Sequence, residues 1–362
     1  MSTTCAVIMA GGVGTRFWPR SREKYPKHLL QIFGKGTMIQ NTVKRLEPLV
    51  QPRNVYVVTN RLQKGAVVKQ LPQVPEENII VEPVGRNTAP CIGLAALHVR
   101  KEHPDAVMIV LPADHLIHND DEFRRILSVA VDTAGESSSL LTIGIPPTHP
   151  ETGYGYIQFR SEPGAENPYY DRGVRQVKTF AEKPNQQTAE QFLASGDFLW
   201  NSGMFVWRAD TILAQIAKCL PDTYAELMKL DREIGTAHYQ QTLEVVYGVI
   251  RGISIDYGVM EKAEKVFVIP GGFGWNDIGS WDEVYRVSGK DDSGNSITGK
   301  VIQKDTKNSY IYSPDKVVAT VGVEDLIIVN TDDALLVVRR GRSQDVKEIS
   351  DYLKRKQMNE YL

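Results

Sequence analysis

The sequence predicts an α/β protein in which a mixed, mostly parallel sheet is flanked by helices and is followed by a β-rich C-terminal domain. In the first part of the chain, apolar runs such as residues 106–111 show no polar alternation, and segments of helical spacing such as residues 120–134 separate them. Strands of this kind are typical of parallel sheets covered on both faces. From residue 296 to residue 338, short apolar runs follow one another with turn residues between them and no long helix. This second pattern predicts a separate β layer or β-solenoid.

The first 145 residues supply the elements of the parallel sheet. Runs of apolar or β-branched residues predict strands at 5–10, 54–59, 78–82, 106–111 and 139–145. Apolar residues three or four positions apart predict helices at 38–50, 89–101 and 120–134.

The elements after Pro146 are more polar. Strand-like segments at 154–159, 174–181 and 199–207 predict a mixed-sheet insertion beside the parallel sheet. A strand is then predicted at 265–269 and a helix at 275–285. Short strands are then predicted at 296–303, 309–312, 317–321, 326–329 and 334–338, with a terminal helix at 343–357. The polar stretch KDDSG at 290–294 separates the two patterns, so we expect one domain at 1–288 and another at 289–362.

Composition excludes several classes of protein. The 362 residues include 42 Lys and Arg and 44 Asp and Glu, a formal net charge of −2. Such a balance argues against a protein that binds nucleic acid or membrane over its whole surface. No apolar run reaches the roughly 18 residues of a membrane span, and the N-terminus lacks the basic segment of a signal peptide. Cys5, Cys91 and Cys219 show neither metal-ligand spacing nor a disulfide framework, which favours reduced thiols in a cytoplasmic protein.

The sequence GGVGTR at 11–16 directly follows the first predicted strand. Glycines at this point let backbone N–H groups approach a phosphate or a base. The spacing is not that of the dinucleotide fingerprint, because Phe17 stands where the third glycine would be, and no Walker A loop is present. From the glycines alone, a tight turn with a purely structural role is as good an interpretation as a ligand-binding loop.

The segment after these glycines is the densest basic cluster of the chain. Arg16, Arg20, Arg22, Lys24 and Lys27 are opposed there by one acidic residue. Arginine offers a planar fork to phosphate oxygens and lysine a mobile charge, so the cluster suits a triphosphate. A solvated basic face is the alternative.

The sequence AGGVGTRFWPRSR at 10–22, followed by YPK at 25–27, resembles the signature loop of the sugar-1-phosphate nucleotidyltransferases. The WPRSR portion is similar to that of the mannose-1-phosphate guanylyltransferases within this family. The resemblance implies a Rossmann-like fold. His28 departs from the family pattern, which has glutamine after the lysine. For the nucleotide, the resemblance implies contacts from Gly11, Gly12, Gly14, Thr15 and Arg16.

The segment EPVGRNTAP at 82–90 resembles the base-recognition segment of the family and implies nucleotide contacts from Glu82, Arg86, Asn87 and Thr88. It lies between a predicted strand and a predicted helix, where α/β sheets bind ligands. A carboxylate at Glu82 can accept from N1–H and the N2 amino group of guanine together, which adenine cannot supply. The alternatives are that Glu82 caps a helix or pairs with Arg86.

Two aspartates are expected to hold Mg²⁺. Asp114 follows the strand at 106–111, and Asp277 lies in WNDIGSW at 275–281. The resemblance assigns both as metal ligands, and two carboxylates on one ion are the expected arrangement for phosphoryl chemistry. A helix cap is the alternative for Asp114 taken alone.

Four further segments resemble the sugar-phosphate pocket of the family. They are TGYGYI at 152–157, FAEKP at 180–184, WNSGMF at 200–205 and SIDYGVMEK at 254–262. The residues implied to bind the sugar phosphate are Gly155, Glu182, Lys183, Asn201 and Asp256.

The C-terminal segment, with TDDALLV at 331–337, resembles the left-handed β-helix-like region of short guanylyltransferases. The resemblance implies transfer of GMP from GTP to α-D-mannose 1-phosphate, giving GDP-mannose and pyrophosphate, with catalytic roles for Arg16, Lys27, Asp114 and Asp277. The alternatives are a nucleotidyltransferase for another sugar 1-phosphate or nucleotide, and a non-catalytic regulator that binds a sugar nucleotide. We expect no nucleic-acid or membrane partner, and the strand edges of the tail allow pairing into a homodimer.

Overall fold

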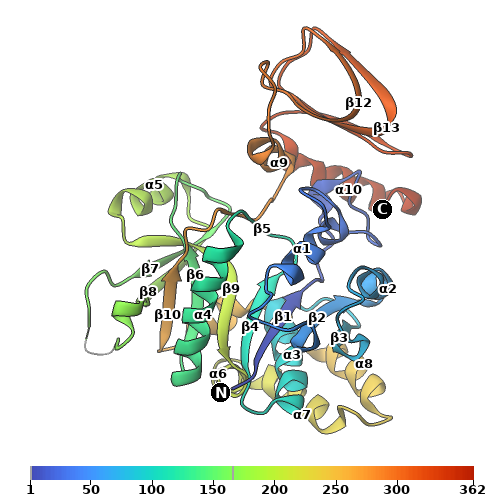
Figure 1. Cartoon of the computed structure of the whole chain (residues 1–362). Helices are drawn as coiled ribbons and strands as arrows, with labels where there is room; N and C mark the ends of the chain where they lie inside the picture. Colours follow the sequence, from blue (N-terminus) through green and yellow to red (C-terminus); the bar gives the residue numbers. More distant parts are fainter. Residues whose placement is uncertain (1, 165–166) are drawn as a thin grey trace. The chain divides into compact units, whose positions relative to one another are not determined.

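The computed structural model describes residues 2–164 and 167–362 (Figure 1). The chain forms two compact units. Unit 1 comprises Met1–Gly11, Thr42–Ala113 and Ile117–Asn276, and unit 2 comprises Gly12–Asn41, Asp114–Leu116 and Asp277–Leu362. This division differs from the predicted one at residue 288, because the glycine-rich loop belongs with the C-terminal segment.

Within its described residues, unit 1 contains a sheet of nine strands in the order β3-β2-β1-β4-β9-β6-β10-β8-β7. The strands are β1 (Thr4–Met9), β2 (Val55–Asn60), β3 (Ile79–Glu82), β4 (Val107–Pro112), β6 (Leu140–Ile145), β7 (Gly155–Phe159), β8 (Arg175–Glu182), β9 (Phe198–Arg208) and β10 (Val266–Pro270). β1 pairs in parallel with β2 and β4, β2 with β3, and β6 with β10. The mixed and mostly parallel core predicted from the apolar runs is confirmed.

The polar strands after Pro146 belong to the same sheet and do not form a mixed-sheet insertion beside it, which corrects the prediction. β9 runs antiparallel between β4 and β6 and so occupies the middle of the sheet. β8 pairs antiparallel with β10 and with β7, and β7 also pairs antiparallel with β9. A central strand needs both faces apolar, and most of β9 is buried.

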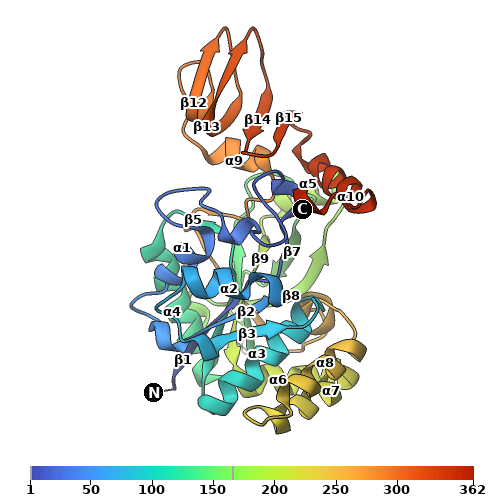
Figure 2. The same ribbon diagram turned by 90° about the vertical axis from the view of Figure 1, so that its right-hand side faces the viewer.

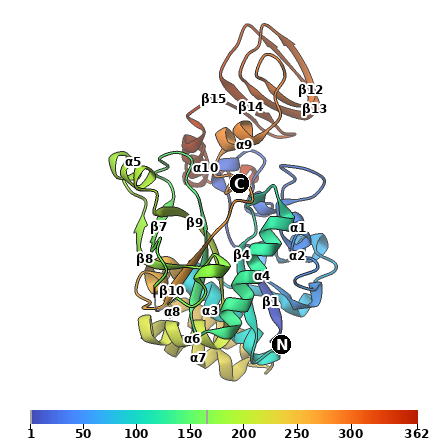
Figure 3. The ribbon, with the colours of Figure 1, turned by 60° about the vertical axis from the view of Figure 1, so that its left-hand side comes forward.

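Helices cover both faces of the sheet in unit 1. They are α2 (Arg61–Gln70), α3 (Thr88–Glu102), α4 (Asp120–Glu136), α5 (Gln186–Ser195), α6 (Ala209–Cys219), α7 (Pro221–Glu233) and α8 (Tyr239–Val249). Cys5, Val7, Met108 and Val110 alternate along β1 and β4 and pack in one cluster with buried residues of α3 and α6. α4 contacts β4, β6 and β9, and Figure 3 shows it on the near side of the sheet, with α3 and α6 beyond.

Three predicted helices are shorter than expected, among them the terminal one at 343–357, whose α-helical part is Val346–Arg355. α1 (Met38–Lys44) ends before Pro48, which lacks the N–H that a continued helix requires. α9 (Trp281–Val287) begins after the short strand β11 (Trp275–Asn276) rather than at Trp275. A further short strand, β5 (Leu116–Ile117), follows Asp114.

Unit 2 carries β12 (Ser296–Lys304), β13 (Tyr310–Val321), β14 (Leu326–Asn330), β15 (Leu335–Arg339) and α10 (Val346–Arg355). β12, β13 and β14 pair in parallel, and β15 closes the layer antiparallel to β14. Figure 2 shows the four strands side by side with α9 next to them. The β-rich C-terminal domain is therefore confirmed, although β13 joins two strands that were predicted separately.

The core of unit 2 explains why the glycine-rich loop groups with the tail. The ring centroids of Phe17 and Trp281 are 5.0 Å apart, and those of Trp281 and Tyr310 are 5.7 Å apart. Val346 of α10 lies in the same buried cluster. In addition, Trp18 Nε1 donates to the carbonyl oxygen of Tyr361 at 2.9 Å. Burial of two aromatic side chains of the loop thus depends on residues far later in the sequence.

Among residues 2–164 and 167–362, the helices are all too short or too polar to cross a bilayer.

Candidate active site

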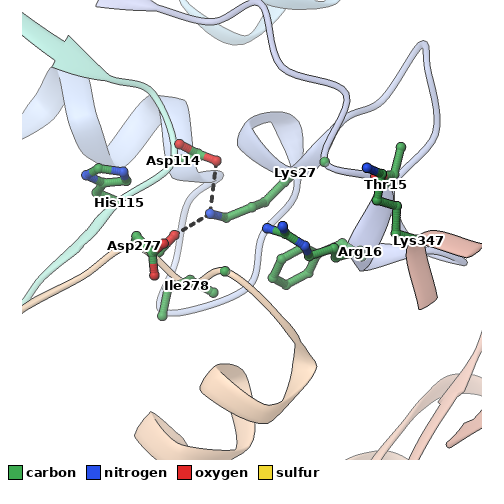
Figure 4. A pocket seen from close by; sticks show the side chains of 11 residues that line it. Thr15, Arg16, Lys27, Asp114, His115, Asp277, Ile278 and Lys347 are labelled. Carbon is green, nitrogen blue, oxygen red and sulfur yellow. Dashed lines mark hydrogen bonds and ion pairs between the residues drawn. The ribbon is translucent and has the colours of Figure 1, made fainter. Parts of the chain in front are cut away.

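A cavity of about 360 Å³ lies within unit 2 at the glycine-rich loop. Its lining residues are Gly14, Thr15, Arg16, Phe17, Lys27, Asp114, His115, Asp277, Ile278, Gly279 and Lys347. Figure 4 shows Lys27 pointing between Asp114 and Asp277, with the Arg16 side chain beside Lys27. The structure therefore brings together the four residues that the sequence predicted to be catalytic.

Lys27 is the central charged group of this cavity. Its Nζ lies 2.9 Å from Asp114 Oδ2 and donates to the backbone oxygen of Asp277 at 2.5 Å. The lysine side chain is only 7% exposed. Burial would raise the pKa of Asp114, but the charges of Lys27 and His115 lower it to about 2. Asp114 is consequently a carboxylate at neutral pH, and an ammonium ion already lies against it.

Gly14 fixes the path of the loop past Lys27. It has a φ of 65°, and a Cβ atom at this position would lie 2.8 Å from Lys27 Cβ. Any other residue would be strained in this conformation and would displace the lysine. Gly12 differs, because a Cβ there would meet no atom of the described residues within 4 Å. The open space at Gly12 suits the approach of a ligand to the backbone.

The backbone is strained at Ile278, beside Asp277. Ile278 is fully buried and has a φ of 48°, which is a rare conformation for a β-branched residue. Such strain persists where surrounding structure holds it and often accompanies functional sites. Here the packing of Ile278 in the core with Phe17 and Trp281 holds the peptide that carries Asp277.

Unit 1 carries the predicted base-recognition segment at the end of β3. Glu82 is 5% exposed, and its Oε1 accepts a hydrogen bond of 3.0 Å from the Tyr247 hydroxyl. A Cβ atom on Gly11 would lie 3.7 Å from Glu82 Oε2. Burial raises the pKa of Glu82 to about 7, and the hydrogen bond from Tyr247 opposes this rise. Glu82 therefore neither pairs with Arg86 nor caps a helix, the two alternatives considered from sequence.

The next residues of this segment have local partners. Arg86 Nε donates to the Tyr247 carbonyl oxygen at 2.8 Å, and Thr88 Oγ1 accepts from the backbone of Ile255 at 2.8 Å. Asn87 caps α3 and has a φ of 68°. The side chains of Arg86 and Thr88 thus hold this segment in place, and their contacts with a nucleotide stay predictions.

The five residues predicted to bind the sugar phosphate lie together in unit 1. Asn201 Nδ2 donates to Asp256 Oδ1 at 2.7 Å, and Lys183 Nζ lies 3.4 Å from Glu182 Oε1. Gly155 pairs with Glu182 across β7 and β8, and a Cβ on this glycine would collide with Glu182 Oε2. Burial raises the pKa of Asp256, and burial together with the charge of Asp256 raises that of Glu182.

Sequence reasoning missed Tyr247 and Lys347. Both lie on helices, α8 and α10, and neither belongs to a recognisable motif. It also assigned too much of the basic cluster to phosphate. The Arg22 guanidinium pairs with Asp333 at 2.7 Å, and the Arg20 guanidinium stacks 4.1 Å from the centre of the Tyr312 ring. These two arginines attach the loop to the C-terminal strands.

Comparison with known proteins gives consistent matches over nearly the whole chain. Residues 5–294 match the nucleotidyl transferase family model, and residues 299–353 match the mannoseP isomerase/GMP-like beta-helix domain. Mannose-1-phosphate guanylyltransferase of Klebsiella pneumoniae is 43% identical over 360 residues, which cover 98% of this chain and 75% of that protein. An Escherichia coli protein of the same name is 42% identical over 360 residues, with the same coverage.

A solved structure agrees with these sequence matches. The crystal structure described as mannose-1-phosphate geranyltransferase from Thermus thermophilus has a TM-score of 0.87 and 34% identity, and covers 97% of this chain and 99% of that chain. The family that the signature loop predicted is thereby confirmed. The chain belongs to the nucleotidyl transferase family, in the branch of the mannose-1-phosphate guanylyltransferases.

Proposed function

We propose that this chain transfers GMP from GTP to α-D-mannose 1-phosphate, giving GDP-mannose and pyrophosphate. The observation that carries this proposal is the cavity in which Arg16, Lys27 and two aspartates meet at a glycine-rich loop. Relatives that are 43% and 42% identical to this chain over 360 aligned residues are named mannose-1-phosphate guanylyltransferases, which supports the choice of sugar and base.

The reaction is an in-line substitution at the α-phosphorus of GTP. An oxygen of the sugar phosphate forms a bond to this phosphorus, and the bond to the bridging oxygen breaks as pyrophosphate leaves. A phosphate monoester is already a nucleophile at neutral pH, so no general base is required. Catalysis then consists of positioning and of neutralising the charge that develops in the transition state.

Lys27 and Arg16 take different parts in this neutralisation. Lys27 is buried and its ammonium group is held against Asp114, and in this proposal that group bridges the α-phosphate and the incoming sugar phosphate. Arg16 lines the cavity beside Lys27 (Figure 4) and would offer a planar fork to the β- and γ-phosphates. The leaving pyrophosphate gains charge, so its binding should strengthen as the bond breaks.

Asp114 and Asp277 would hold Mg²⁺ in this cavity. The donor set fits, because it consists of carboxylate and carbonyl oxygens that already surround one cation, the Lys27 ammonium. Within the described residues, no three His, Cys, Asp or Glu side chains form a metal cluster. Mg²⁺ is commonly held by one or two carboxylates together with water and substrate phosphates, so two aspartates would be enough protein ligands. When bound, the ion would neutralise phosphate charge.

The two clusters of unit 1 would select the base and the sugar. The carboxylate of Glu82 can accept from N1–H and the N2 amino group of guanine. For the sugar, Glu182, Asp256 and Asn201 offer oxygen and amide groups to hydroxyls, and Lys183 offers an ammonium group to the phosphate. Lys183 has a φ of 47°, a strained conformation of the kind expected where a side chain must be aimed.

Pyrophosphate release tests this proposal against its alternatives. The chain is incubated with Mg²⁺, one of the nucleotides GTP, ATP, UTP or dTTP, and one of the sugars mannose 1-phosphate or glucose 1-phosphate. We expect release with GTP and mannose 1-phosphate together and none with either alone. Preference for another pair would replace the substrate assignment. Binding of GDP-mannose without release for any pair would favour the non-catalytic regulator.

A cytoplasmic location and a homodimeric assembly are part of the same proposal. Apolar side chains on the C-terminal strands, among them Ile302, Val317 and Val321, are exposed in the single chain. Exposed apolar residues on paired strands favour association. Sedimentation equilibrium should return about twice the mass of 40.5 kDa, and a mass of one chain would reject the dimer.

A further inference from the structure

Lys347 lines the phosphate cavity although it lies far beyond the glycine-rich loop in the sequence. It is the second residue of α10, whereas Arg16 and Lys27, which also line the cavity, belong to the loop. Figure 4 shows its side chain reaching from α10 toward Thr15. The sequence pattern of α10, a polar terminal helix, gives no sign of a substrate contact.

The position of Lys347 is fixed by its neighbours on α10. Val346 is buried in the core that contains Phe17, and Ser350 Oγ donates to the Thr15 carbonyl oxygen at 3.2 Å. Leu353 is buried one turn later. Residues 346, 350 and 353 share one face of a helix, so this face attaches α10 to the loop. Lys347 is thereby held beside the turn that carries Arg16.

The charges around the cavity are unevenly neutralised. Lys27 is paired with Asp114, and Arg22 is paired with Asp333. Within residues 2–164 and 167–362, neither Arg16 nor Lys347 forms an ion pair. Arg16 and Lys347 therefore add two positive charges to the cavity lining that no carboxylate of the described residues neutralises. A cavity with this surplus of positive charge is suited to an anion of high charge.

We propose that Lys347 binds the terminal phosphates of the nucleoside triphosphate and of the leaving pyrophosphate, together with Arg16. This inference rests on the proposed function and assigns to the C-terminal domain a residue of the substrate site. The β- and γ-phosphates carry most of the charge of a triphosphate, and a lysine ammonium at the surface of a cavity is a mobile counter-charge for them. A sugar nucleotide such as GDP-mannose lacks the pyrophosphate that leaves, so Lys347 has no comparable group to bind in the product.

The test compares ligands that carry the terminal phosphates with one that does not. Isothermal titration calorimetry on the full chain, with Mg²⁺ present, measures the affinity for inorganic pyrophosphate, for GTP and for GDP-mannose. Lys347→Met removes the charge but keeps an apolar stem of similar length, and Lys347→Arg keeps the charge. The matched control is Lys356→Met, which removes the same charge just beyond α10, where Lys356 lies near the Tyr352 ring instead of the cavity.

We expect Lys347→Met to weaken pyrophosphate and GTP about tenfold, the lower end for a charge-assisted contact that solvent reaches. GDP-mannose affinity should change less than about twofold, and Lys347→Arg should restore most of the pyrophosphate affinity. Lys356→Met should bind all three ligands as the parent does. Melting temperature and circular dichroism establish that each variant is folded.

Two results would overturn the inference. If Lys347→Met binds pyrophosphate as tightly as the parent, the lysine makes no phosphate contact. If it weakens all three ligands equally, Lys347 acts by holding the loop and not by binding phosphate. Failure of the proposed function has a different signature, since the parent chain would then make no GDP-mannose from GTP and mannose 1-phosphate whatever the calorimetry shows.

Discussion

The change Glu82→Gln should make the folded chain more stable at pH 8 while making it a poorer user of GTP. Burial raises the pKa of Glu82 to about 7 from its ordinary 4.5. At about 1.4 kcal/mol for each pH unit, ionising this buried group costs about 3 kcal/mol of folding free energy. The folded chain holds the proton more tightly than the unfolded chain. Stability conferred by Glu82 is therefore lost as the pH rises from 4.5 to 7, and the full cost remains above pH 7.

Glutamine removes the ionisation and keeps an oxygen that can accept from the Tyr247 hydroxyl. The buried amide N–H groups of the glutamine lose the hydrogen bonds that they make with water, which offsets roughly 1–2 kcal/mol of the gain in folding free energy. We expect Glu82→Gln to raise the free energy of unfolding in urea by about 1–2 kcal/mol at pH 8, and the gain to disappear at pH 5. Glu77→Gln is the control, because Glu77 is exposed just before the same strand. If parent and variant were equally stable at pH 8, ionisation of Glu82 would not destabilise the folded chain.

The same variant tests how guanine is selected. An amide presents one acceptor and one donor where the carboxylate presents two acceptors, so it cannot receive N1–H and the N2 amino group together. Loss of this charge-assisted contact should lower kcat/KM for GTP by roughly ten- to a hundredfold and narrow the preference for GTP over ITP, which lacks the N2 amino group.

In the parent, kcat/KM should fall as the pH drops below 7 because Glu82 becomes protonated. Cys91 and Tyr247 next to Glu82 stay neutral throughout, since burial raises both of their pKa values well above the usual range. If the ratio of kcat/KM for GTP to that for ITP is the same in Glu82→Gln and in the parent, Glu82 does not bind the N2 amino group of guanine.

Three further predictions concern the cavity and its support. Asp277→Asn should keep the fold but lose most Mg²⁺-dependent turnover, as should Asp114→Asn, and normal activity of either across a Mg²⁺ titration would exclude it as a ligand. Lys27→Ala should lower kcat more than it weakens nucleotide binding, and Arg16→Lys should also lower kcat because an ammonium group cannot replace a planar fork. If either variant changes only the KM for GTP, that residue binds the ground state and does not act in the transition state. Phe17→Ala should destabilise unit 2 by about 3–5 kcal/mol, since its ring packs 5.0 Å from that of Trp281, and an unchanged tryptophan-fluorescence melting curve would contradict this packing.

The parts of the fold predicted from sequence are those whose signal is local. The run at 106–111 is apolar at every position and became β4, buried along Val107–Leu111. The central place of β9 had no such signal, because strand order depends on pairing between residues far apart in the sequence, such as Val107 with Arg208. α2 carries Gly65 and few apolar residues, so its helical pattern was too weak to recognise.

In the candidate site, too, the residues predicted from sequence are those in local motifs, and the residues that were missed are those whose partners lie far away in the sequence. Arg16, Lys27, Asp114 and Asp277 lie in motifs that resemble a known family, and the structure brings them to one cavity. The partners that hold or complete the site lie on ordinary helices and strands. Asp333, which pairs with Arg22, follows it by 311 residues. Only the folded chain reveals that two arginines of the basic cluster attach the loop to the C-terminal strands and do not face the phosphate cavity.

The reaction proposed for this chain joins GMP to a sugar phosphate with release of pyrophosphate. Phosphorus-31 NMR of GTP, mannose 1-phosphate and Mg²⁺ with catalytic amounts of the chain follows every phosphorus atom at once. We expect the GTP and sugar-phosphate signals to fall together, while the two diphosphate signals of GDP-mannose and the signal of pyrophosphate rise in equal molar amounts. Release of inorganic phosphate, or a sugar-phosphate signal that stays constant while GTP disappears, would contradict it.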